Sequence, residues 1–179
     1  MTNKIIHIYG ASGSGTTTLA KYISEKLDYV FMDTDDYFWK PTNPPYKEER
    51  NISERLELMK KDIVKSDKVI ISGSLVDWGD ELIPLFTLVI RLNTATDIRI
   101  ERLKRREYEH FGSRIEIGGD MYDAHQKFLA WAAAYDCGDI NMRSKAKHDK
   151  WQKLLQCKQI ILDGSTDVED NFKIIKSYL

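Results

Sequence analysis

Short apolar runs alternate along this chain with longer stretches in which apolar residues recur every three or four positions. The short runs predict five β-strands, at residues 5–9, 29–32, 68–72, 88–92 and 159–163. The longer stretches predict helices at 19–27, 52–64, from about 96 to 106, 123–135, from about 143 to 155, and 168–179, with Ser53 and either Thr94 or Thr96 as N-caps. Strands that alternate with helices predict an α/β fold, a parallel sheet with helices on both faces.

A glycine-rich stretch, Gly10 to Thr18, lies between the first predicted strand and the first predicted helix. Gly10 and Gly15 flank four residues, which is the spacing of a phosphate-binding P-loop in its expected place. Glycines allow successive backbone N–H groups to surround a phosphate, and the positive end of the following helix dipole adds to the attraction. The residues expected to contact phosphate are Gly10, Ser12, Gly13, Ser14, Gly15, Thr16, Thr17 and Thr18.

One position departs from the P-loop pattern, because Thr16 stands where Lys normally reaches the β- and γ-phosphates. A Gly/Ser-rich turn without a ligand is the simplest alternative, but the flanking strand and helix and the Thr17 hydroxyl in the magnesium position favour phosphate binding. A dinucleotide-binding fold is the other alternative. It is disfavoured because its fingerprint is Gly-x-Gly-x-x-Gly, whereas the glycines here follow Gly-x-x-Gly-x-Gly.

Three acidic residues, Asp33, Asp35 and Asp36, follow the second predicted strand. Ligands of open α/β sheets bind beyond the carboxyl ends of strands, so these carboxylates are expected near the P-loop. Magnesium or a polyhydroxyl substrate would relieve their repulsion, although an Asp that caps the next helix is an alternative, most of all for Asp36. The third strand ends at 72–74 without a Walker B Asp. The Mg²⁺-binding role therefore falls to Asp33, together with Thr17, or is missing.

The segment from 37 to 46 contains three of the four prolines and four aromatic residues, which predicts a loop that could form one wall of a substrate pocket. Arg50 and Arg55 follow at the start of the next helix, where a solvated position and a substrate contact are equally compatible with the sequence. The expected substrate-binding segment is therefore about 36–66.

Arginines at 99, 102, 105 and 106 lie around one predicted helix, and Arg114 follows between Gly112 and Gly118-Gly119. Arginines interrupted by glycine hinges are typical of a mobile lid at about 105–122, whose guanidinium groups can bind phosphoryl oxygens bidentately. An ordinary solvated helix with i,i+4 pairs such as Glu101 and Arg105 is the alternative. We expect at least one of Arg102, Arg106 and Arg114 to face phosphate.

The composition of the chain argues against some classes of function. The 179 residues suit one compact domain, and 27 Lys and Arg nearly balance 28 Asp and Glu, so no overall positive charge is present to attract nucleic acid or a membrane surface. A start without a leader pattern, the lack of a long apolar window, and two isolated cysteines predict a cytoplasmic protein with reduced thiols. The oligomeric state is left open.

The chain resembles the P-loop nucleoside monophosphate kinase and shikimate kinase superfamily over nearly its whole length. Gly10 to Thr17 match the phosphate loop apart from the Lys, and 31–35, Phe-Met-Asp-Thr-Asp, is similar to the strand-end motif of shikimate kinases. The resemblance implies magnesium at Asp33, substrate hydroxyls at Asp35, a turn towards substrate at Gly73, and a lid around Arg102 to Arg114. It also implies a five-strand parallel sheet in the order 2-3-1-4-5, and a similar loop ending in Thr-Thr-Thr occurs in unassigned bacterial adenylate kinase-like proteins.

The sequence supports a kinase hypothesis most strongly. An ATP-dependent phosphotransferase would transfer the γ-phosphoryl group to a nucleoside monophosphate or a small hydroxylated metabolite, with Asp35 orienting the acceptor and Arg106 and Arg114 neutralising charge. A nucleotide-binding module with little turnover, because Thr16 replaces the Lys, is the alternative. A nicotinamide-dependent oxidoreductase is disfavoured by the glycine spacing.

Overall fold

The computed structural model describes residues 4–179. The elements in chain order are β1 (Lys4–Gly10), α1 (Thr16–Leu27), β2 (Val30–Asp33), α2 (Thr34–Phe38), α3 (Ile52–Ile63), β3 (Lys68–Ser72), η1 (Asp80–Leu85), β4 (Leu88–Asn93), α4 (Thr96–Phe111), η2 (Gly112–Ile115), α5 (Tyr122–Ala133), η3 (Ala134–Asp136), α6 (Lys145–Gln152), β5 (Lys158–Asp163) and α7 (Val168–Lys176). The alternation of strands and helices predicted from the hydrophobic pattern is confirmed.

The five strands form one parallel sheet in the order β2-β3-β1-β4-β5, as the family resemblance implied. Because all neighbours are parallel, the carboxyl ends of β1, β2 and β3 lie at the same edge. The register pairs Asp33 at the end of β2 with Ser72 at the end of β3, and Ser72 in turn with Ile8 of β1. This register brings the residues after three strands to one place.

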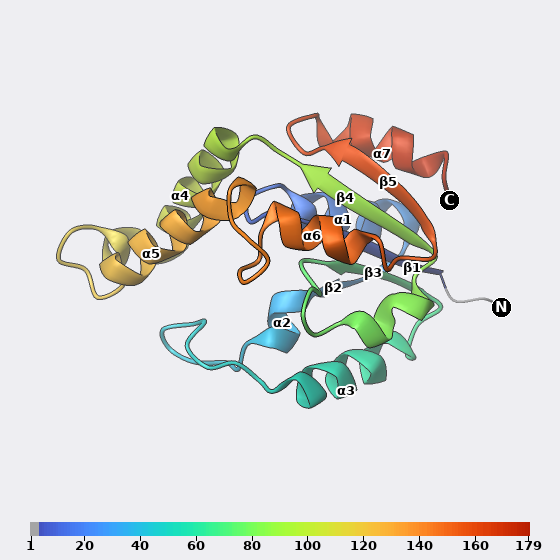
Figure 1. The fold of residues 1–179 in the computed structure, drawn as a ribbon, viewed down its shortest axis with the longest axis horizontal. Helices are drawn as coiled ribbons and strands as arrows, with labels where there is room; N and C mark the ends of the chain where they lie inside the picture. Colours follow the sequence, from blue (N-terminus) through green and yellow to red (C-terminus); the bar gives the residue numbers. More distant parts are fainter. Residues whose placement is uncertain (1–3) are drawn as a thin grey trace.

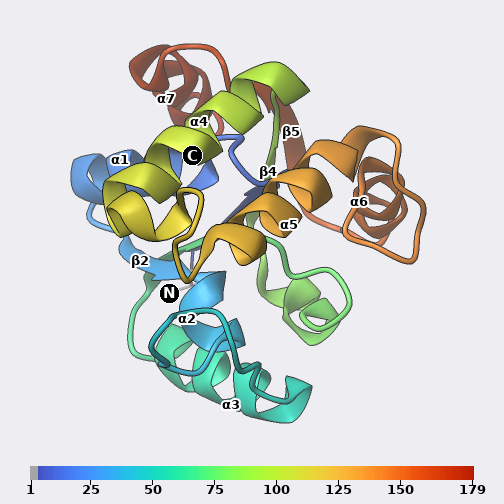
Figure 2. The ribbon, with the colours of Figure 1, turned by 90° about the vertical axis from the view of Figure 1, so that its left-hand side faces the viewer.

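Two apolar layers cover the sheet (Figures 1 and 2). On one face, α1 and α7 pack over residues such as Ile6, Ile8 and Ile90, all completely buried. The other core includes residues of α3, η1 and α6 with Tyr9 and Ile71 of the sheet. The central strands are apolar towards both layers because both faces are covered, as expected of parallel sheets.

Helices α4 and α5 extend away from the sheet as an antiparallel arm (Figure 1). A small apolar cluster around Leu103, Leu129 and Ala132 joins the two helices. This arm contains the segment that was predicted to be a lid.

Several local boundaries differ from the sequence prediction. Asn51, not Ser53, caps α3, because its side chain accepts a hydrogen bond of 2.8 Å from the Glu54 N–H. Neither Thr94 nor Thr96 caps α4. The N-cap is Ala95, while the Thr94 hydroxyl donates to the Ser14 carbonyl and the Thr96 hydroxyl donates to Asp136.

The aromatic segment and the C-terminal helix also begin or end differently from the prediction. The first two residues of the predicted aromatic loop, Tyr37 and Phe38, belong to the short helix α2, and the chain becomes irregular only after them. The last helix ends at Lys176 rather than at Leu179.

Candidate functional site

The P-loop connects β1 to α1 and has a backbone shape that requires glycine. Gly13 has a φ of +82°, and a Cβ atom there would lie 2.6 Å from the carbonyl oxygen of Arg99 in α4. Gly15, with a φ of +98°, is the N-cap of α1. The loop therefore packs closely against α4 on one side, while its residues from 10 to 18 other than Ser14 line an open cleft at the N-terminus of α1.

Oxygen atoms from three elements converge beside the loop. The Thr17 hydroxyl in the first turn of α1 donates to Oδ2 of Asp33 at 3.4 Å and lies 3.4 Å from the hydroxyl of Ser72. The other Asp33 oxygen accepts the Asp35 N–H at 3.1 Å, so Asp33 also caps α2. The capping role considered most of all for Asp36 therefore belongs to Asp33.

The electrostatics of Asp33 favour a cation next to it. Burial raises the pKa of Asp33 to about 6, and the charges of Asp35 and Asp36 act in the same direction. Within residues 4–179 there is no group of three or more His, Cys, Asp or Glu side chains that could hold a metal ion by themselves. Thr17 and Asp33 nevertheless fit Mg²⁺, because this ion is commonly held by one or two protein oxygens together with water and substrate phosphates.

Asp35 lies in the same cleft, where its side chain is accessible to solvent and is also surrounded by the atoms of the cleft walls. The surrounding walls raise the pKa of Asp35 by desolvation, while the positive charges of Arg143 and Arg106 oppose that rise. The structure thus brings together the carboxylates at 33 and 35, as the sequence predicted.

Arg143 is a cleft residue that the sequence reasoning missed. Its guanidinium group donates to the Ser12 hydroxyl at 3.4 Å and lies over the Trp131 ring, 4.6 Å from the ring centroid. Burial lowers the pKa of Arg143 and the negative charge of Asp35 raises it, and the side chain remains a cation. Arg143 was predicted to lie at the start of a helix, whereas α6 begins at Lys145. The partners of Arg143 are distant in the chain, so no local pattern identified it as a cleft residue.

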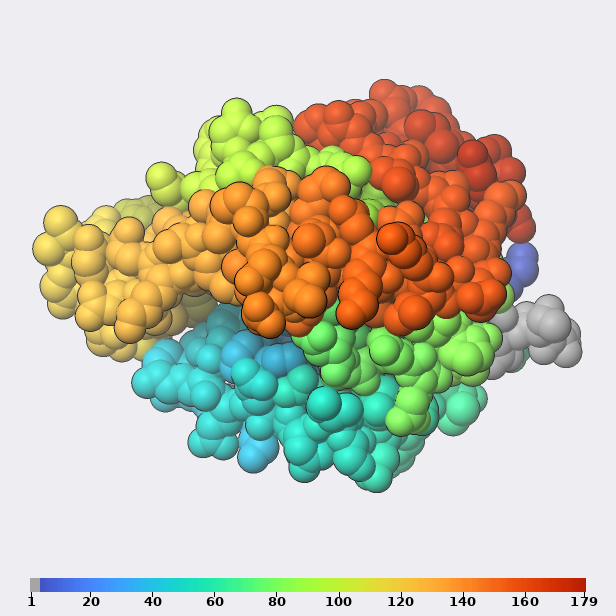
Figure 3. All heavy atoms as spheres, viewed as in Figure 1, coloured from blue at the N-terminus to red at the C-terminus, as the bar shows by residue number. Residues whose placement is uncertain are grey.

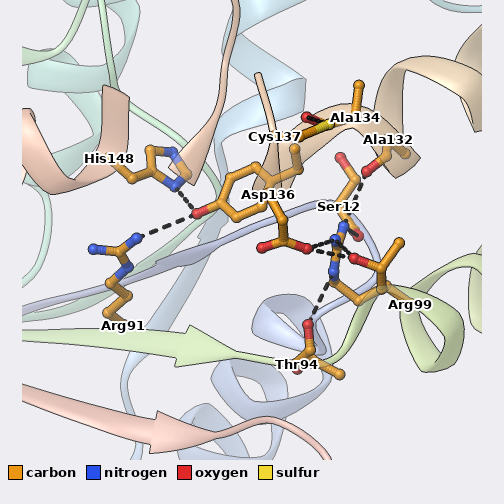
Figure 4. A network of polar contacts seen from close by, with 11 residues as sticks. Ser12, Arg91, Thr94, Arg99, Ala132, Ala134, Asp136, Cys137 and His148 are labelled. Atoms are coloured by element: carbon orange, nitrogen blue, oxygen red, sulfur yellow. Dashed lines mark hydrogen bonds and ion pairs between the residues drawn. The ribbon is translucent and has the colours of Figure 1, made fainter. Parts of the chain in front are cut away.

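Arg99 corrects the prediction that the arginines of α4 are displayed around the helix. It is completely buried, and its guanidinium group donates to Asp136, to Thr96 and to the carbonyl groups of Thr94, Ala132 and Ser12 (Figure 4). The residue shares a helix face with the buried Leu103 four positions later, which is the signal that could have placed it inside. Through the Ser12 carbonyl, Arg99 links α4 to the P-loop.

The three arginines, of which at least one is expected to face phosphate, occupy different positions. Arg102 donates to the Gly164 carbonyl at 3.0 Å and lies beside Gly15. Arg106 is half exposed in the cleft and pairs with Glu107 at 3.4 Å. Arg114 forms two hydrogen bonds with Asp120, at 3.0 and 2.8 Å, on the exposed end of the arm. Phosphate contacts by these residues remain predictions.

The opposite wall of the cleft comes from α2, α3 and the segment between them (Figure 3). Arg55 is buried there rather than solvated, with its guanidinium carbon 3.5 Å from the centroid of the Phe38 ring and an ion pair of 2.9 Å to Glu49. Gly73 at the end of β3 also lines the cleft, and its φ is +111°. Both residues therefore line the cleft, and substrate contact by either remains a prediction.

Known proteins share this architecture. The family described as "AAA domain" matches residues 6–118, more than half of the chain. The protein YqaC of Bacillus subtilis, described as uncharacterized, is 38% identical over 98% of this chain and 97% of its own length. Cytidylate kinase of Methanococcus aeolicus is 29% identical over 62% of this chain and 68% of its own.

A solved structure of deoxyadenosine kinase from M. mycoides with bound dATP has a TM-score of 0.56 and 17% identity, covering 97% of this chain and 98% of that chain. The chain belongs to the family of P-loop proteins described as "AAA domain". Its resemblance to nucleoside monophosphate and shikimate kinases is confirmed. Family and fold together imply nucleotide binding and support phosphotransfer as the general class of activity.

The structure also bears on membrane association. From residue 4 to residue 179, no helix has the length and apolar character needed to cross a bilayer.

Proposed function

We propose that this protein is an ATP-dependent phosphotransferase that moves the γ-phosphoryl group of ATP to a nucleoside monophosphate or a small hydroxylated metabolite. The observation that carries the proposal is the convergence of Thr17, Asp33 and Asp35 at the mouth of a P-loop, with Arg143 and Arg106 facing Asp35. Phosphoryl transfer depends mostly on positioning and on neutralisation of charge, and these groups supply both.

Each residue has a distinct role in this proposal. Backbone N–H groups of the loop and the N-terminus of α1 hold the triphosphate, and Thr17 and Asp33 hold Mg²⁺, which neutralises phosphate charge when it is bound. For a hydroxylated acceptor, Asp35 accepts the hydrogen bond and then the proton of the reacting hydroxyl, whose oxygen bonds to the γ-phosphorus as the bond to ADP breaks. Arg106 and Arg114 belong to a lid at about 105–122 that excludes water, and Arg55 and Gly73 belong to an acceptor segment at about 36–66.

Arg143 supports catalysis despite Thr16 in the lysine position. Its guanidinium group donates to the loop hydroxyl of Ser12, and the Asp35 charge acts on it, which is consistent with a position between the donor and acceptor ends of the cleft. An arginine in this place can bind phosphoryl oxygens that a lysine would otherwise contact.

The alternative is a nucleotide-binding module with little or no turnover, because the loop Lys is absent. The experiment that separates the two measures ADP formation from Mg·ATP alone and with a panel of nucleoside monophosphates, nucleosides and small polyols. The proposal predicts that at least one acceptor raises ADP formation well above the hydrolysis rate. Binding of ATP without acceptor-dependent ADP formation from any member of the panel would favour the alternative.

A further inference from the structure

A chain of buried polar side chains leads from β4 to the cleft and takes no part in the roles described above. In Figure 4, dashed lines from Arg91 and His148 meet at one hydroxyl group. This hydroxyl belongs to Tyr135 of η3 and lies 3.4 Å from Arg91 Nη2 and 2.8 Å from His148 Nδ1. The other ring nitrogen, Nε2, lies 3.0 Å from the hydroxyl of Ser74. Ser74 follows Gly73 and lines the cleft together with Asp35 and Arg143.

The direction of these hydrogen bonds follows from the chemistry of the first member. A guanidinium group can only donate, so the Tyr135 oxygen accepts from Arg91, and the Tyr135 hydrogen has Nδ1 of His148 as its acceptor. Burial, followed by the charges of Arg143 and Arg91, lowers the pKa of His148 to about 3, so the ring is neutral and carries one hydrogen. That hydrogen is on Nε2 and is donated to the Ser74 oxygen.

The reverse direction would leave a buried donor without a partner. If Nδ1 carried the hydrogen, the Tyr135 oxygen would accept from both neighbours and its own hydrogen would have no acceptor among its hydrogen-bonding neighbours in the part of the chain described. With the Ser74 oxygen accepting from His148, the Ser74 hydroxyl hydrogen has no other partner among residues 4–179 and is available to a molecule in the cleft.

We propose that Ser74 is a specificity-determining residue of the acceptor site, which donates its hydroxyl hydrogen to an anionic oxygen of the phosphoryl acceptor and is held in that role by Arg91, Tyr135 and His148. The inference rests on the proposed kinase function and deepens it. The anionic character is inferred from Arg143, a cation that lines the same cleft as Ser74. The shared chemistry is an oxyacid group, either the phosphate of a nucleoside monophosphate or the carboxylate of a hydroxy acid.

The buried side chains are positioning residues, since they act on the acceptor through Ser74. His148 is completely buried, and Tyr135 is also buried. Tyr9 supplies a matched control. It is a buried tyrosine whose ring packs edge-on against His148 at 5.1 Å, yet its hydroxyl has no hydrogen-bond partner among residues 4–179. Removal of the Tyr9 hydroxyl therefore perturbs the same neighbourhood without interrupting the chain.

The first part of the test needs no ligand. Two-bond ¹H–¹⁵N correlation spectra of the natural protein, with His148 assigned by comparison with His148→Gln, should show the hydrogen on Nε2 and an unprotonated Nδ1. Tyr135→Phe should abolish this preference, and Tyr9→Phe should preserve it. A hydrogen on Nδ1 in the natural protein would overturn the proposal whatever the activity of the enzyme.

The second part measures phosphorylation of CMP, AMP, gluconate, shikimate and uridine with Mg·ATP, which separates phosphate, carboxylate and neutral acceptors. Ser74→Ala should raise the KM of the preferred anionic acceptor by about tenfold and leave the KM of ATP unchanged. Tyr135→Phe should raise the KM of the acceptor less, and Tyr9→Phe should leave the KM of the acceptor unchanged. An unchanged acceptor KM in Ser74→Ala, or a preference for uridine, would overturn the role of Ser74. If no acceptor is phosphorylated, the proposed function fails and the acceptor role fails with it, whereas the spectra still decide the direction of the chain.

Discussion

The hydroxyl of Thr17 and the carboxylate of Asp33 meet at 3.4 Å, which joins the first turn of α1 to the end of β2. The contact exists because β2 and β3 are neighbours in a parallel sheet whose register places Asp33 beside Ser72, under the P-loop. Asp33 thus lies beside the end of β3, which has no acidic residue of its own. Two oxygen ligands next to a phosphate site are the arrangement expected for magnesium.

Substitution of Asp33 tests the metal assignment. Asp33→Asn retains a side-chain oxygen that can cap α2 but removes the negative charge, so it should weaken binding of Mg·ATP more than binding of ATP in EDTA. Asp36→Asn, an exposed neighbour in the same cleft, is the matched control and should affect both affinities little. Calorimetric titration with and without Mg²⁺ measures both affinities. An equal loss for the two forms of ATP in Asp33→Asn would refute the metal role.

Closure of the arm is expected at residues 106–119. Arg114 pairs with Asp120 at an exposed position, and Gly112 and Gly118 have positive φ angles on either side of it. Binding of a non-hydrolysable ATP analogue should slow amide hydrogen exchange in this segment, because a phosphate-bound arginine would draw the arm over the cleft. Exchange in η1, none of whose residues lines the cleft, should change little. If amide hydrogen exchange at 106–119 is unchanged at a saturating concentration of the ATP analogue, the prediction of a lid is contradicted.

Gly73→Ala should disturb the end of β3 and the start of α2. The φ of Gly73 is +111°, and a Cβ atom would lie 1.9 Å from the Thr34 hydroxyl oxygen. We expect a loss of about 2–4 kcal/mol in the free energy of unfolding from strain and overpacking. Gly118→Ala, where φ is +88° and no atom lies within 4 Å of the added Cβ, should cost only about 1 kcal/mol. Urea denaturation compares the two, and similar losses would show that crowding at Thr34 is unimportant.

The burial of His7 predicts that the folded protein loses stability at low pH. His7 is completely buried between the rings of Tyr9 and Phe86, and burial lowers its pKa to about 3. The unfolded chain, with a His pKa of about 6.5, therefore binds more protons than the folded protein below pH 6.5, and stability is lost as the pH falls. For His7 alone this loss amounts to about 2 kcal/mol between pH 7 and pH 5.

His7→Phe should remove that part of the pH dependence, because phenylalanine preserves the stack and does not titrate. His110→Phe, at an exposed position, is the control and should retain the acid sensitivity of the natural protein. Urea denaturation at pH 7 and pH 5 provides the measurement. Equal acid sensitivity in His7→Phe and the natural protein would mean that His7 is not held neutral by the fold.

Local sequence patterns predicted those parts of the structure that depend on neighbours in the chain. The P-loop and the acids after β2 were found because glycine spacing and strand ends are local features, and the family resemblance added the strand order. Arg143 was not predicted to be a cleft residue because its partners Ser12 and Asp35 are more than a hundred residues away in the chain. Arg99 was misplaced because charge suggested solvent, whereas five hydrogen-bonding groups from other segments and its own helix satisfy it inside.

Loss of the loop lysine should be visible in the affinity for ATP. A charge-assisted contact contributes about 1.5–3 kcal/mol, so Thr16→Lys should tighten binding of Mg·ATP by about tenfold to a hundredfold. Arg143→Met should weaken binding in the natural protein and weaken it less in the Thr16→Lys background, because the two cations would serve the same oxygens. Arg106→Ala and Arg114→Ala should follow the same direction if the lid closes. Additive effects of Thr16→Lys and Arg143→Met would show that Arg143 does not compensate.

Calorimetric titration of Mg·ATP into the natural protein and into Thr16→Lys tests the central claim most directly. The loop, the Thr17 hydroxyl and the Asp33 carboxylate lie together in one cleft, where we propose that a triphosphate and its metal bind. The account predicts measurable but loose binding to the natural protein and tighter binding to Thr16→Lys. If neither protein binds any nucleoside triphosphate, although both remain folded, the phosphate-loop assignment and the kinase function that depends on it are contradicted.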